Sequence, residues 1–427
     1  MNKSLAQRDK EFVWHPFTQM KTAPEPLEIV KAKDAWLILE NGRKLLDANS
    51  SWWTVLHGHC NSYIGKKIAE QYQEIDHVIF AGATHPKAVE TAERIVGALP
   101  NHFSKVFFSD NGSTAVEVGI KMIYQYWHNK GGSKKRFLAL EGAYHGDTFG
   151  AMSVSQRGYF NAPFEHLFFE VDYIPVPTDE NYKEVLTKAE EILKTGEVAG
   201  FIFEPLVQGA AGMRIYKAEY LDQLIALAKK YEVLTIADEV MTGFYRTGTL
   251  FAINQLKEEP DIITMSKGIT GGVLPIGLTV ATQEIYDAFL DDATTKALLH
   301  GHSFTGNPIS CAAVCANLDL LESEETNQKI ETIVGWHKAY FNKIENHPMV
   351  DKIRQAGTIL SINLKDEADN GYFSNIREIA LNHFWDKNIL LRPLGNVVFI
   401  NAPYCISEGE MNSIYKAIDE LLEKLSK

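Results

Sequence analysis

The sequence predicts an α/β fold built on a mostly parallel central sheet with helices on both faces. Two observations support this prediction. Short apolar runs alternate with segments of helical periodicity, and glycine, hydroxyl and charged residues follow directly after several of the runs. This alternation is typical of doubly wound sheets, which bind ligands at the carboxyl ends of their strands. The runs that we expect to form strands are residues 105–110, 136–142, 200–205, 233–238 and 261–266.

Helical segments lie next to these runs. Residues 113–128 follow the first run and residues 219–232 precede the fourth, both with apolar side chains at helical spacing. Near the end of the chain, Ser407 and Glu410 form a capping-box pattern before an amphipathic helix over residues 411–425. We expect this last stretch to belong to a separate subdomain of mixed α and β structure.

The composition disfavours several classes of protein. The chain has 42 Lys and Arg against 55 Asp and Glu, a net charge of −13, which argues against nucleic acid and anionic membrane surfaces as partners. No apolar run approaches the ~20 residues of a membrane span, and the first residues contain no apolar segment typical of a secretory signal. The 4 cysteines are too few for a disulfide framework, so we expect a cytoplasmic protein.

Residues after four of the strands could together bind a cofactor. Gly112 and Ser113 open a helix whose N–H groups could bind a phosphate, although an ordinary helix cap has the same composition. Asp238 ends one strand and Lys267 follows another; taken alone, each could be a solvated surface charge. Pyridoxal phosphate needs a lysine, a carboxylate at its pyridine nitrogen, a phosphate cradle and an aromatic face, which Tyr144 could supply.

These residues stand in segments that resemble class III pyridoxal-phosphate aminotransferases of fold type I. The matching segments are "SDNGSTAVE" at 109–117, "EGAYHGDTFGAMS" at 141–153, "IADEVMTGFYRTG" at 236–248 and "MSKGITGG" at 265–272. They occur in family order, and the resemblance covers nearly the whole chain. It implies a large cofactor domain over residues 61–316 and a small α+β domain formed by residues 1–60 and 317–427. It also implies a homodimer with its active sites at the interface.

The resemblance assigns roles around pyridoxal 5'-phosphate. Lys267 matches the lysine that binds the cofactor covalently and then moves a proton as general acid and base. Asp238 matches the acid at the pyridine nitrogen, Glu204 the carboxylate that supports it, and Tyr144 the residue that stacks on the ring. The other residues that the resemblance places at the cofactor are Gly112, Ser113, His145, His302 and, from the second subunit, Ser303.

Five further segments resemble the subgroup that aminates 7-keto-8-aminononanoate to 7,8-diaminononanoate in biotin synthesis. They are "WHPFTQM" at 14–20, "SSWW" at 50–53, "EPLVQGAAGMRIY" at 204–216, "HGHSFTGNP" at 300–308 and "LRPLGN" at 391–396. The resemblance places six residues at the substrates: Phe17, Trp52, Trp53, Asp147, Arg246 and Arg392. Arg392 would bind the substrate carboxylate, and the tryptophans would line an apolar groove. On an extended strand, however, the two rings would point to opposite faces.

Alternatives remain open at this stage. Phe17 stands where members that use S-adenosylmethionine often have tyrosine, so the amino donor is S-adenosylmethionine or lysine. Another class III ω-aminotransferase, acting on a diamine or an ω-amino acid, is the competing function. The Lys267 and Asp238 pair argues against a non-catalytic cofactor carrier. His57 and His59 cluster with a cysteine, but no further ligand set with zinc-type spacing follows, so we expect no metal.

Overall fold

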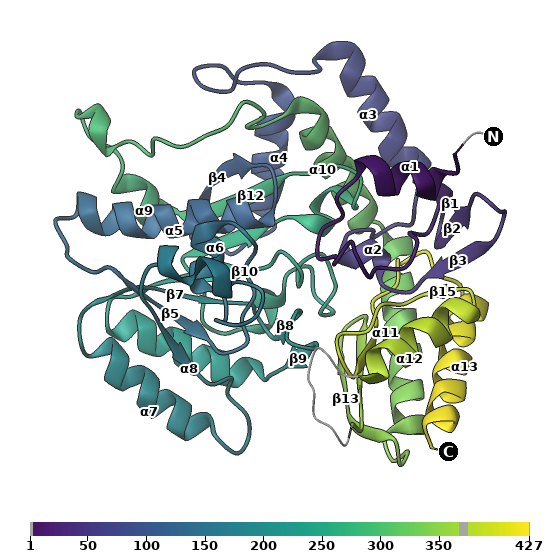
Figure 1. Ribbon diagram of the computed structural model, residues 1–427. Helices are drawn as coiled ribbons and strands as arrows, with labels where there is room; N and C mark the ends of the chain where they lie inside the picture. Colours follow the sequence, from purple (N-terminus) through teal and green to yellow (C-terminus); the bar gives the residue numbers. More distant parts are fainter. Residues whose placement is uncertain (1–2, 367–374, 427) are drawn as a thin grey trace.

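A seven-stranded sheet forms the centre of the computed structural model, which describes residues 3–366 and 375–426 (Figure 1). The strands lie in the order β4 (Phe103–Ser109), β12 (Gly277–Thr282), β11 (Ile262–Met265), β10 (Leu234–Asp238), β7 (Val198–Phe203), β5 (Arg136–Leu140) and β6 (Val171–Ile174). Only β12 runs antiparallel to its neighbours. The predicted mostly parallel sheet is therefore confirmed, and all five expected strands belong to it.

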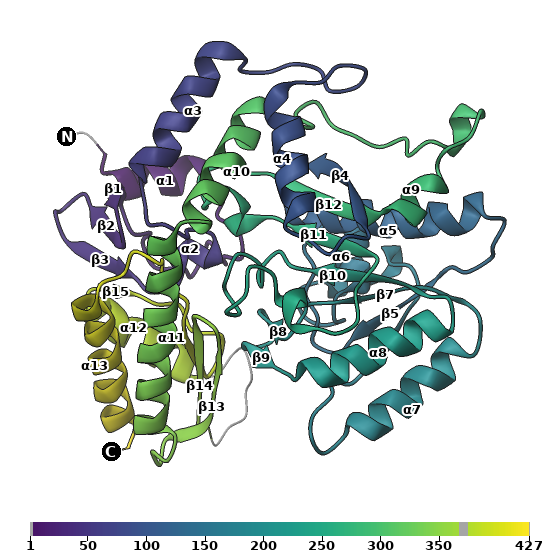
Figure 2. The same cartoon turned by 180° about the vertical axis from the view of Figure 1, so that it is seen from behind.

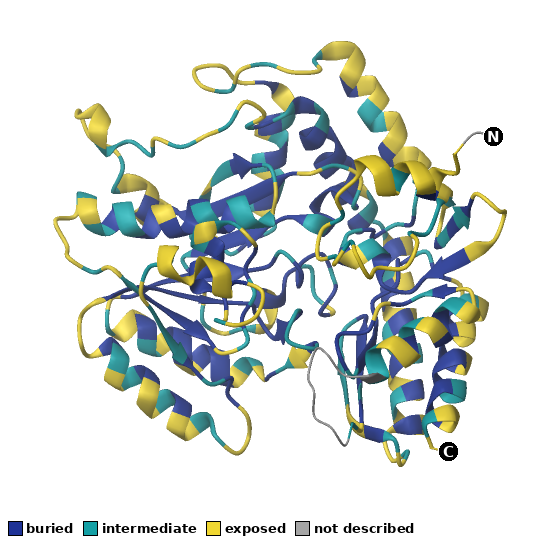
Figure 3. Ribbon diagram, in the orientation of Figure 1, coloured by how far each residue is buried: buried dark blue, intermediate teal, exposed yellow. Residues whose placement is uncertain are grey.

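Helices cover both faces of this sheet. Helix α5 lies on one face, and α7 and α8 lie on the other (Figure 1, Figure 2). Their bounds are Gly112–Asn129, Tyr182–Leu193 and Ala218–Lys230. Because both faces are covered, the central strands are buried along their whole length, and every residue of β7 is buried (Figure 3). This burial explains why the strands read as continuous apolar runs.

Two strands of the seven-stranded sheet, β6 and β12, were absent from the sequence prediction. Strand β6 has only four residues and is partly exposed. Strand β12 contains buried Thr279 and Thr282, which interrupt its apolar pattern. The Thr279 hydroxyl donates to the carbonyl of Ala115 at 2.7 Å, which satisfies its hydrogen-bonding need inside the core.

A second body of structure combines the two ends of the chain. Strands β1 (Ile29–Lys33), β2 (Trp36–Leu39) and β3 (Lys44–Asp47) form one sheet with β15 (Ile389–Leu390). A second, antiparallel sheet contains β13 (Val350–Ala356), β14 (Ile359–Leu364) and β16 (Val397–Ile400). The helices beside it are α11 (Glu324–Ile344), α12 (Asn375–Asp386) and α13 (Glu408–Leu425), and both termini lie on this side (Figure 1).

The C-terminal helix begins as its sequence predicted. The Ser407 side chain accepts from the N–H of Glu410, whose side chain accepts in turn from the N–H of Ser407. The expected domain limits at 60/61 and 316/317 stay a prediction. Helix α10 (Pro308–Leu321) continues across the second of these limits without a break. Within the described ranges, no helix is long and apolar enough to span a membrane.

His337 of α11 is a buried residue that should make folding stability depend on pH. Its Nδ1 lies 2.8 Å from the Tyr415 hydroxyl and its Nε2 lies 3.0 Å from the Thr358 carbonyl oxygen. Burial lowers the pKa of His337 to about 4 from its ordinary 6.5. Between these values the unfolded chain binds a proton that the folded chain does not, so stability falls as the pH drops from 6.5 towards 4. At pH 5 the loss is roughly 2 kcal/mol.

Urea unfolding at pH 7.5 and pH 5 of the wild type and of His337→Gln checks this expectation. The wild type should lose roughly 2 kcal/mol more than the variant between the two pH values. Buried carboxyl groups titrate in the same range in both proteins, so their effects cancel. Exposed His166, replaced by glutamine, serves as the control and should retain the wild-type dependence. Equal pH dependence in the wild type and the His337 variant would contradict the assignment.

Candidate active site

A cavity of about 640 Å³ lies where the five predicted strands end. The residues that follow these strands line it, because parallel strands bring their carboxyl ends to one edge of the sheet. Those that the sequence had singled out are Gly112, Ser113, Tyr144, His145, Asp147, Glu204, Asp238 and Lys267. The geometry thus gathers residues that are up to 155 positions apart in the chain (267 − 112).

Lys267 opens a short 3₁₀ turn, η3 (Lys267–Thr270), directly after β11. Its backbone has φ +48°, a left-handed conformation that a residue with a side chain rarely adopts. Its amine Nζ lies 4.8 Å from the centre of the Trp53 ring. Burial lowers the pKa of Lys267, and the negative charges of Asp238 and Glu204 offset part of this effect. A lysine with a lowered pKa is a better nucleophile and proton acceptor near neutral pH.

Asp238 is held by three hydrogen-bond donors. Its Oδ2 lies 2.7 Å from Nδ1 of His145, and its Oδ1 accepts from the N–H of Val240 at 3.1 Å and from the Thr264 hydroxyl at 3.3 Å. These contacts fix the position of the Asp238 side chain at the cavity. His145 therefore lies at the cavity, as expected, and contacts the acid directly.

Glu204 contacts the main chain and makes no hydrogen bond with Asp238. One carboxylate oxygen accepts from the N–H of Tyr144 at 3.1 Å, and the other accepts from the N–H of Gly209 at 2.9 Å. Burial raises the pKa of Glu204 to about 7, and the charge of Asp238 acts in the same direction. Glu204 supports the site by fixing the loop that carries Tyr144.

The start of α5 provides free N–H groups at the cavity. Asn111 caps the helix through a reciprocal pair of hydrogen bonds with Thr114, which leaves the first N–H groups, those of Gly112 and Ser113, without a partner inside the helix. Glycine is required for the neighbouring loop to approach: a Cβ at Gly146, which has φ +129°, would lie 2.0 Å from the Ser113 hydroxyl. Such a helix start can bind a phosphate group.

Tyr144 and Asp147 lie at the mouth of the cavity. The Tyr144 hydroxyl donates to Asp147 at 3.0 Å. Burial raises the pKa of Tyr144, and the charge of Asp147 adds to this effect. The Tyr144 ring lines the cavity, as expected of a residue that stacks on a planar ligand.

The two tryptophans lie on the same side of the chain, because a turn takes the place of the extended strand on which their rings would point to opposite faces. Residues 50–53, labelled α2 (Ser50–Trp53) in Figure 1, all have φ between +44° and +72° and form a left-handed turn. The rings of Trp52 and Trp53 therefore stack, with centres 4.9 Å apart and planes 15° apart. Trp53 is 3% exposed and lines the cavity, whereas Trp52 is 40% exposed and does not. The guanidinium of Arg392 lies 5.7 Å from the centre of the Trp52 ring.

Polar side chains hold this strained turn in place. The Ser51 hydroxyl donates to Asp47 at 2.7 Å, and the Ser50 hydroxyl donates to the carbonyl of Asn401 at 2.7 Å. Asn49 accepts from the N–H of Arg392 at 2.6 Å. The turn is thereby tied to the segment that carries Arg392.

Arg246 lies outside the lining of the cavity, so its expected contact with a substrate stays a prediction. Its side chain is 1% exposed and donates to the carbonyls of Val55 and Ala402, each at 3.2 Å. The guanidinium also lies 5.1 Å from the centre of the Tyr404 ring. Arg246 therefore acts as a packing residue behind the tryptophan turn.

Four other expected residues also lie outside the lining of the cavity: Phe17, His302, Ser303 and Arg392. Phe17 is 65% exposed and packs edge-on against Phe160. His302 and Ser303 lie in the loop before α10 and do not line the cavity of their own chain. A contribution of Ser303 from a second subunit stays a prediction.

The sequence analysis missed Thr264 and Val240, both of which bind Asp238. A threonine inside a strand gives no signal of its own, because β-branched residues are common there. Val240 also lines the cavity and contacts the helix start, since a Cβ at Gly112 would lie 2.7 Å from its side chain. Its position two residues after the strand-end acid was the available signal.

The site fits pyridoxal phosphate. Amine, carboxylate, aromatic ring and helix start all face one cavity. Two buried nitrogens at its wall, Nε2 of His145 and Nε1 of Trp53, have no hydrogen-bond partner among the described residues, and such groups usually bind a ligand or water. By contrast, the described part of the chain contains no group of three or more His, Cys, Asp and Glu side chains that could hold a metal ion.

Known proteins resemble this chain over nearly its full length. The aminotransferase class-III family model matches residues 18–422. An adenosylmethionine-8-amino-7-oxononanoate aminotransferase from Synechococcus elongatus is 45% identical and aligns with 97% of this chain and 99% of its own. The protein of the same name from Geobacter sulfurreducens is 37% identical, with 99% and 98% aligned.

Solved structures show the same architecture. The crystal structure of an adenosylmethionine-8-amino-7-oxononanoate aminotransferase from Methanocaldococcus jannaschii has a TM-score of 0.93 and 34% identity, and covers 98% of both chains. A PLP-bound amine transaminase from an uncultivated Pseudomonas species has a TM-score of 0.90 and 27% identity, and covers 97% of this chain and 98% of its own.

Proposed function

Because the chain belongs to the aminotransferase class-III family, we propose that it binds pyridoxal phosphate and aminates 8-amino-7-oxononanoate. This acceptor is the 7-keto-8-aminononanoate named above, and the product is the 7,8-diaminononanoate of biotin synthesis. The observation that carries the proposal is a series of contacts that leads from Lys267 through Trp53 and Trp52 to Arg392. The Lys267 amine lies 4.8 Å from the centre of the Trp53 ring, the two ring centres lie 4.9 Å apart, and the Arg392 guanidinium lies 5.7 Å from the centre of the Trp52 ring.

The residues around the cofactor position have complementary tasks. Bound pyridoxal phosphate supplies an electron sink that eases ionisation of a C–H bond next to nitrogen. Lys267 would bind the cofactor, and its Nζ would then remove the proton from the amine-bearing carbon of the substrate. Asp238, kept in place by His145 and Thr264, would provide the negative charge for the pyridine nitrogen. The N–H groups of Gly112 and Ser113 would hold the phosphate.

The aromatic wall suits the acceptor. The substrate is an aliphatic chain with a reacting ketone near one end and a carboxylate at the other. Each methylene packed against Trp53 and Trp52 gains up to ~0.8 kcal/mol. Beyond them, the planar guanidinium of Arg392 can bind the carboxylate with two parallel hydrogen bonds. This chemistry favours the long keto acid over a short, polar diamine.

We also propose that the protein is a homodimer with Ser303 completing the neighbouring site. Large apolar side chains around that loop are exposed, with Leu299 at 71%, Phe304 at 63% and Ile79 at 67%. Apolar groups of this size seldom stay exposed together on a monomer. A two-fold dimer would bury the same surface on both copies.

A donor screen tests the proposed reaction. The purified protein, loaded with pyridoxal phosphate, is incubated with 8-amino-7-oxononanoate and either S-adenosylmethionine or lysine, and the diamine product is measured by mass spectrometry. We expect product with one of the two donors. Cofactor-free protein serves as the control. Absence of product with both donors, together with turnover of putrescine or 4-aminobutyrate, would favour the competing ω-aminotransferase.

A further inference from the structure

The turn that carries Lys267 needs support from its surroundings. Lys267 has a left-handed backbone conformation. A residue strained in this way keeps its conformation only where several contacts with neighbouring groups hold it. Three contacts come from the turn and the following loop. The N–H of Ile269 donates to the carbonyl of Ser266 at 3.1 Å, the N–H of Gly271 donates to the carbonyl of Gly268 at 2.9 Å, and the Ser266 hydroxyl donates to the carbonyl of Ile276 at 2.7 Å. The carbonyls of Gly268 and Ile269 also accept from a different element.

Asn317 of α10 binds both of these carbonyls. Its Nδ2 donates to the carbonyl oxygen of Gly268 at 3.1 Å and to that of Ile269 at 3.0 Å. The side chain is fully buried, with 0% exposure. Because both amide hydrogens are used, the two bonds fix the turn relative to the helix in two directions.

His57 fixes the amide in turn. Its Nε2 lies 3.0 Å from Oδ1 of Asn317. Since Oδ1 can only accept, Nε2 of His57 is the donor. Burial lowers the pKa of His57 to about 4, so the ring is neutral near pH 7 and carries its proton on Nε2. This explains the first histidine of the "HGHC" segment without a metal ion.

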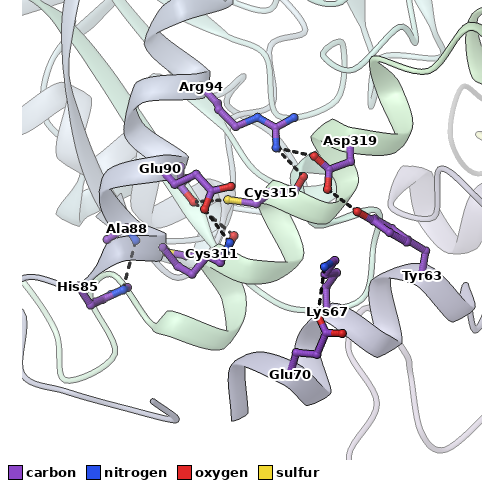
Figure 4. A network of polar contacts seen from close by, with 12 residues as sticks. Tyr63, Lys67, Glu70, His85, Ala88, Glu90, Arg94, Cys311, Cys315 and Asp319 are labelled. Atoms are coloured by element: carbon purple, nitrogen blue, oxygen red, sulfur yellow. Dashed lines mark hydrogen bonds and ion pairs between the residues drawn. The ribbon is translucent and has the colours of Figure 1, made fainter. Parts of the chain in front are cut away.

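The opposite side of α10 is anchored to two other helices (Figure 4). Arg94 of α4 (Pro86–Gly97) donates to the carboxylate of Asp319 at 2.7 Å and to the carbonyl of Cys315 at 3.1 Å. Tyr63 of α3 (Ser62–Glu74) donates to Asp319 at 2.7 Å. Helix α10 is therefore a fixed frame, from which Asn317 reaches inward to the lysine turn.

We propose that Asn317, oriented by His57, is a positioning residue that sets the direction of the Lys267 side chain in the cavity. Neither residue lines the cavity, so both act through the main chain of the turn. The direction of Nζ decides whether the amine faces the substrate carbon. The inference rests on the proposed role of Lys267 and adds to it the two residues that hold the lysine.

Three variants and one matched control test the clamp. Asn317→Leu and His57→Leu remove the hydrogen bonds. His57→Gln retains an N–H donor in place of Nε2. The control is Thr91→Val, which removes a buried contact between Thr91 and the carbonyl of Cys311 on the same helix α10. Each protein is examined by thermal unfolding, by kcat and KM, and by the rate at which Lys267 of the cofactor-free protein reacts with acetic anhydride across a pH series.

We expect Asn317→Leu to lower kcat by about 10-fold to 10²-fold, the usual effect of a small displacement of a reacting group. KM for the acceptor should change much less. The pH midpoint and rate of Lys267 acetylation should also change, whereas His57→Gln should stay close to wild type and His57→Leu should follow Asn317→Leu. Thr91→Val should alter thermal unfolding only.

The outcomes distinguish a failure of the proposed function from a failure of the proposed roles of Asn317 and His57. If pyridoxal phosphate does not protect Lys267 of the wild type from acetylation, the proposed function fails. If it does protect, but Asn317→Leu and His57→Leu behave like Thr91→Val, with lower stability and unchanged acetylation, the clamp is wrong and the proposed function stands.

Discussion

Replacing Lys267 with alanine should abolish amino transfer. The substitution removes the amine that binds the cofactor and the group that moves the proton. Loss of a general acid–base alone costs about 10²-fold to 10⁴-fold in rate, and loss of covalent binding adds to this. The alanine variant should also fail to form a covalent adduct when the loaded protein is treated with borohydride, as measured by mass spectrometry of its peptides.

A surface lysine provides the control for this experiment. Lys105 lies over the Tyr286 ring, away from the cavity, and its replacement by alanine should leave both activity and labelling intact. In the wild type, the labelled peptide should contain Lys267. A label on another lysine, or substantial activity in Lys267→Ala, would remove the basis of the proposed function.

Replacing Asp238 with asparagine should have the second largest effect. The variant keeps the size of the side chain but loses the negative charge, and its single carbonyl oxygen can accept at only one of the two positions, from His145 or from Thr264. Without that charge the pyridine nitrogen no longer holds its proton, and the electron sink weakens. Removal of one electrostatic contact at a reacting group typically costs 10²-fold to 10³-fold in kcat, and we expect a fall of roughly this size.

Single-turnover absorbance measurements can show in which half of the reaction the rate is lost. With excess amino donor, the loaded Asp238→Asn protein should bind cofactor but convert it slowly in the first half of the reaction. Asp172→Asn is a matched control, because Asp172 also lies in the central sheet but pairs with Arg136 at 2.6 Å instead of facing the cavity. A normal half-reaction rate in Asp238→Asn would exclude the proposed role of the acid.

The centre of the fold and of the site could be predicted from local sequence patterns. Fully buried parallel strands produce continuous apolar runs, and parallel strands end at one edge of their sheet. Asp238 and Lys267 were identifiable for this reason. Gly112 was identifiable because glycine and hydroxyl residues at a helix start suit a phosphate.

The conformation of the tryptophan turn and the burial of Arg246 depend on contacts between distant segments, which local sequence patterns do not encode. The stacking of Trp52 and Trp53 requires four consecutive left-handed residues, a conformation that costs roughly 1–2 kcal/mol per residue. Hydrogen bonds to distant residues hold that turn, such as the one that the Ser50 hydroxyl donates to the carbonyl of Asn401. The burial of Arg246 likewise follows from the carbonyl of Ala402, far along the chain.

The tryptophan turn also has a consequence for biosynthesis. Its supports at Arg392, Phe399 and Asn401 are synthesised more than 340 positions after Asn49. Every strand of the central sheet, by contrast, precedes residue 283. Since domains commonly form in the order of synthesis, a nascent chain can assemble the lysine and its acid well before it has an aromatic wall. The proposed aromatic wall therefore forms only after residues 392–401 have been synthesised.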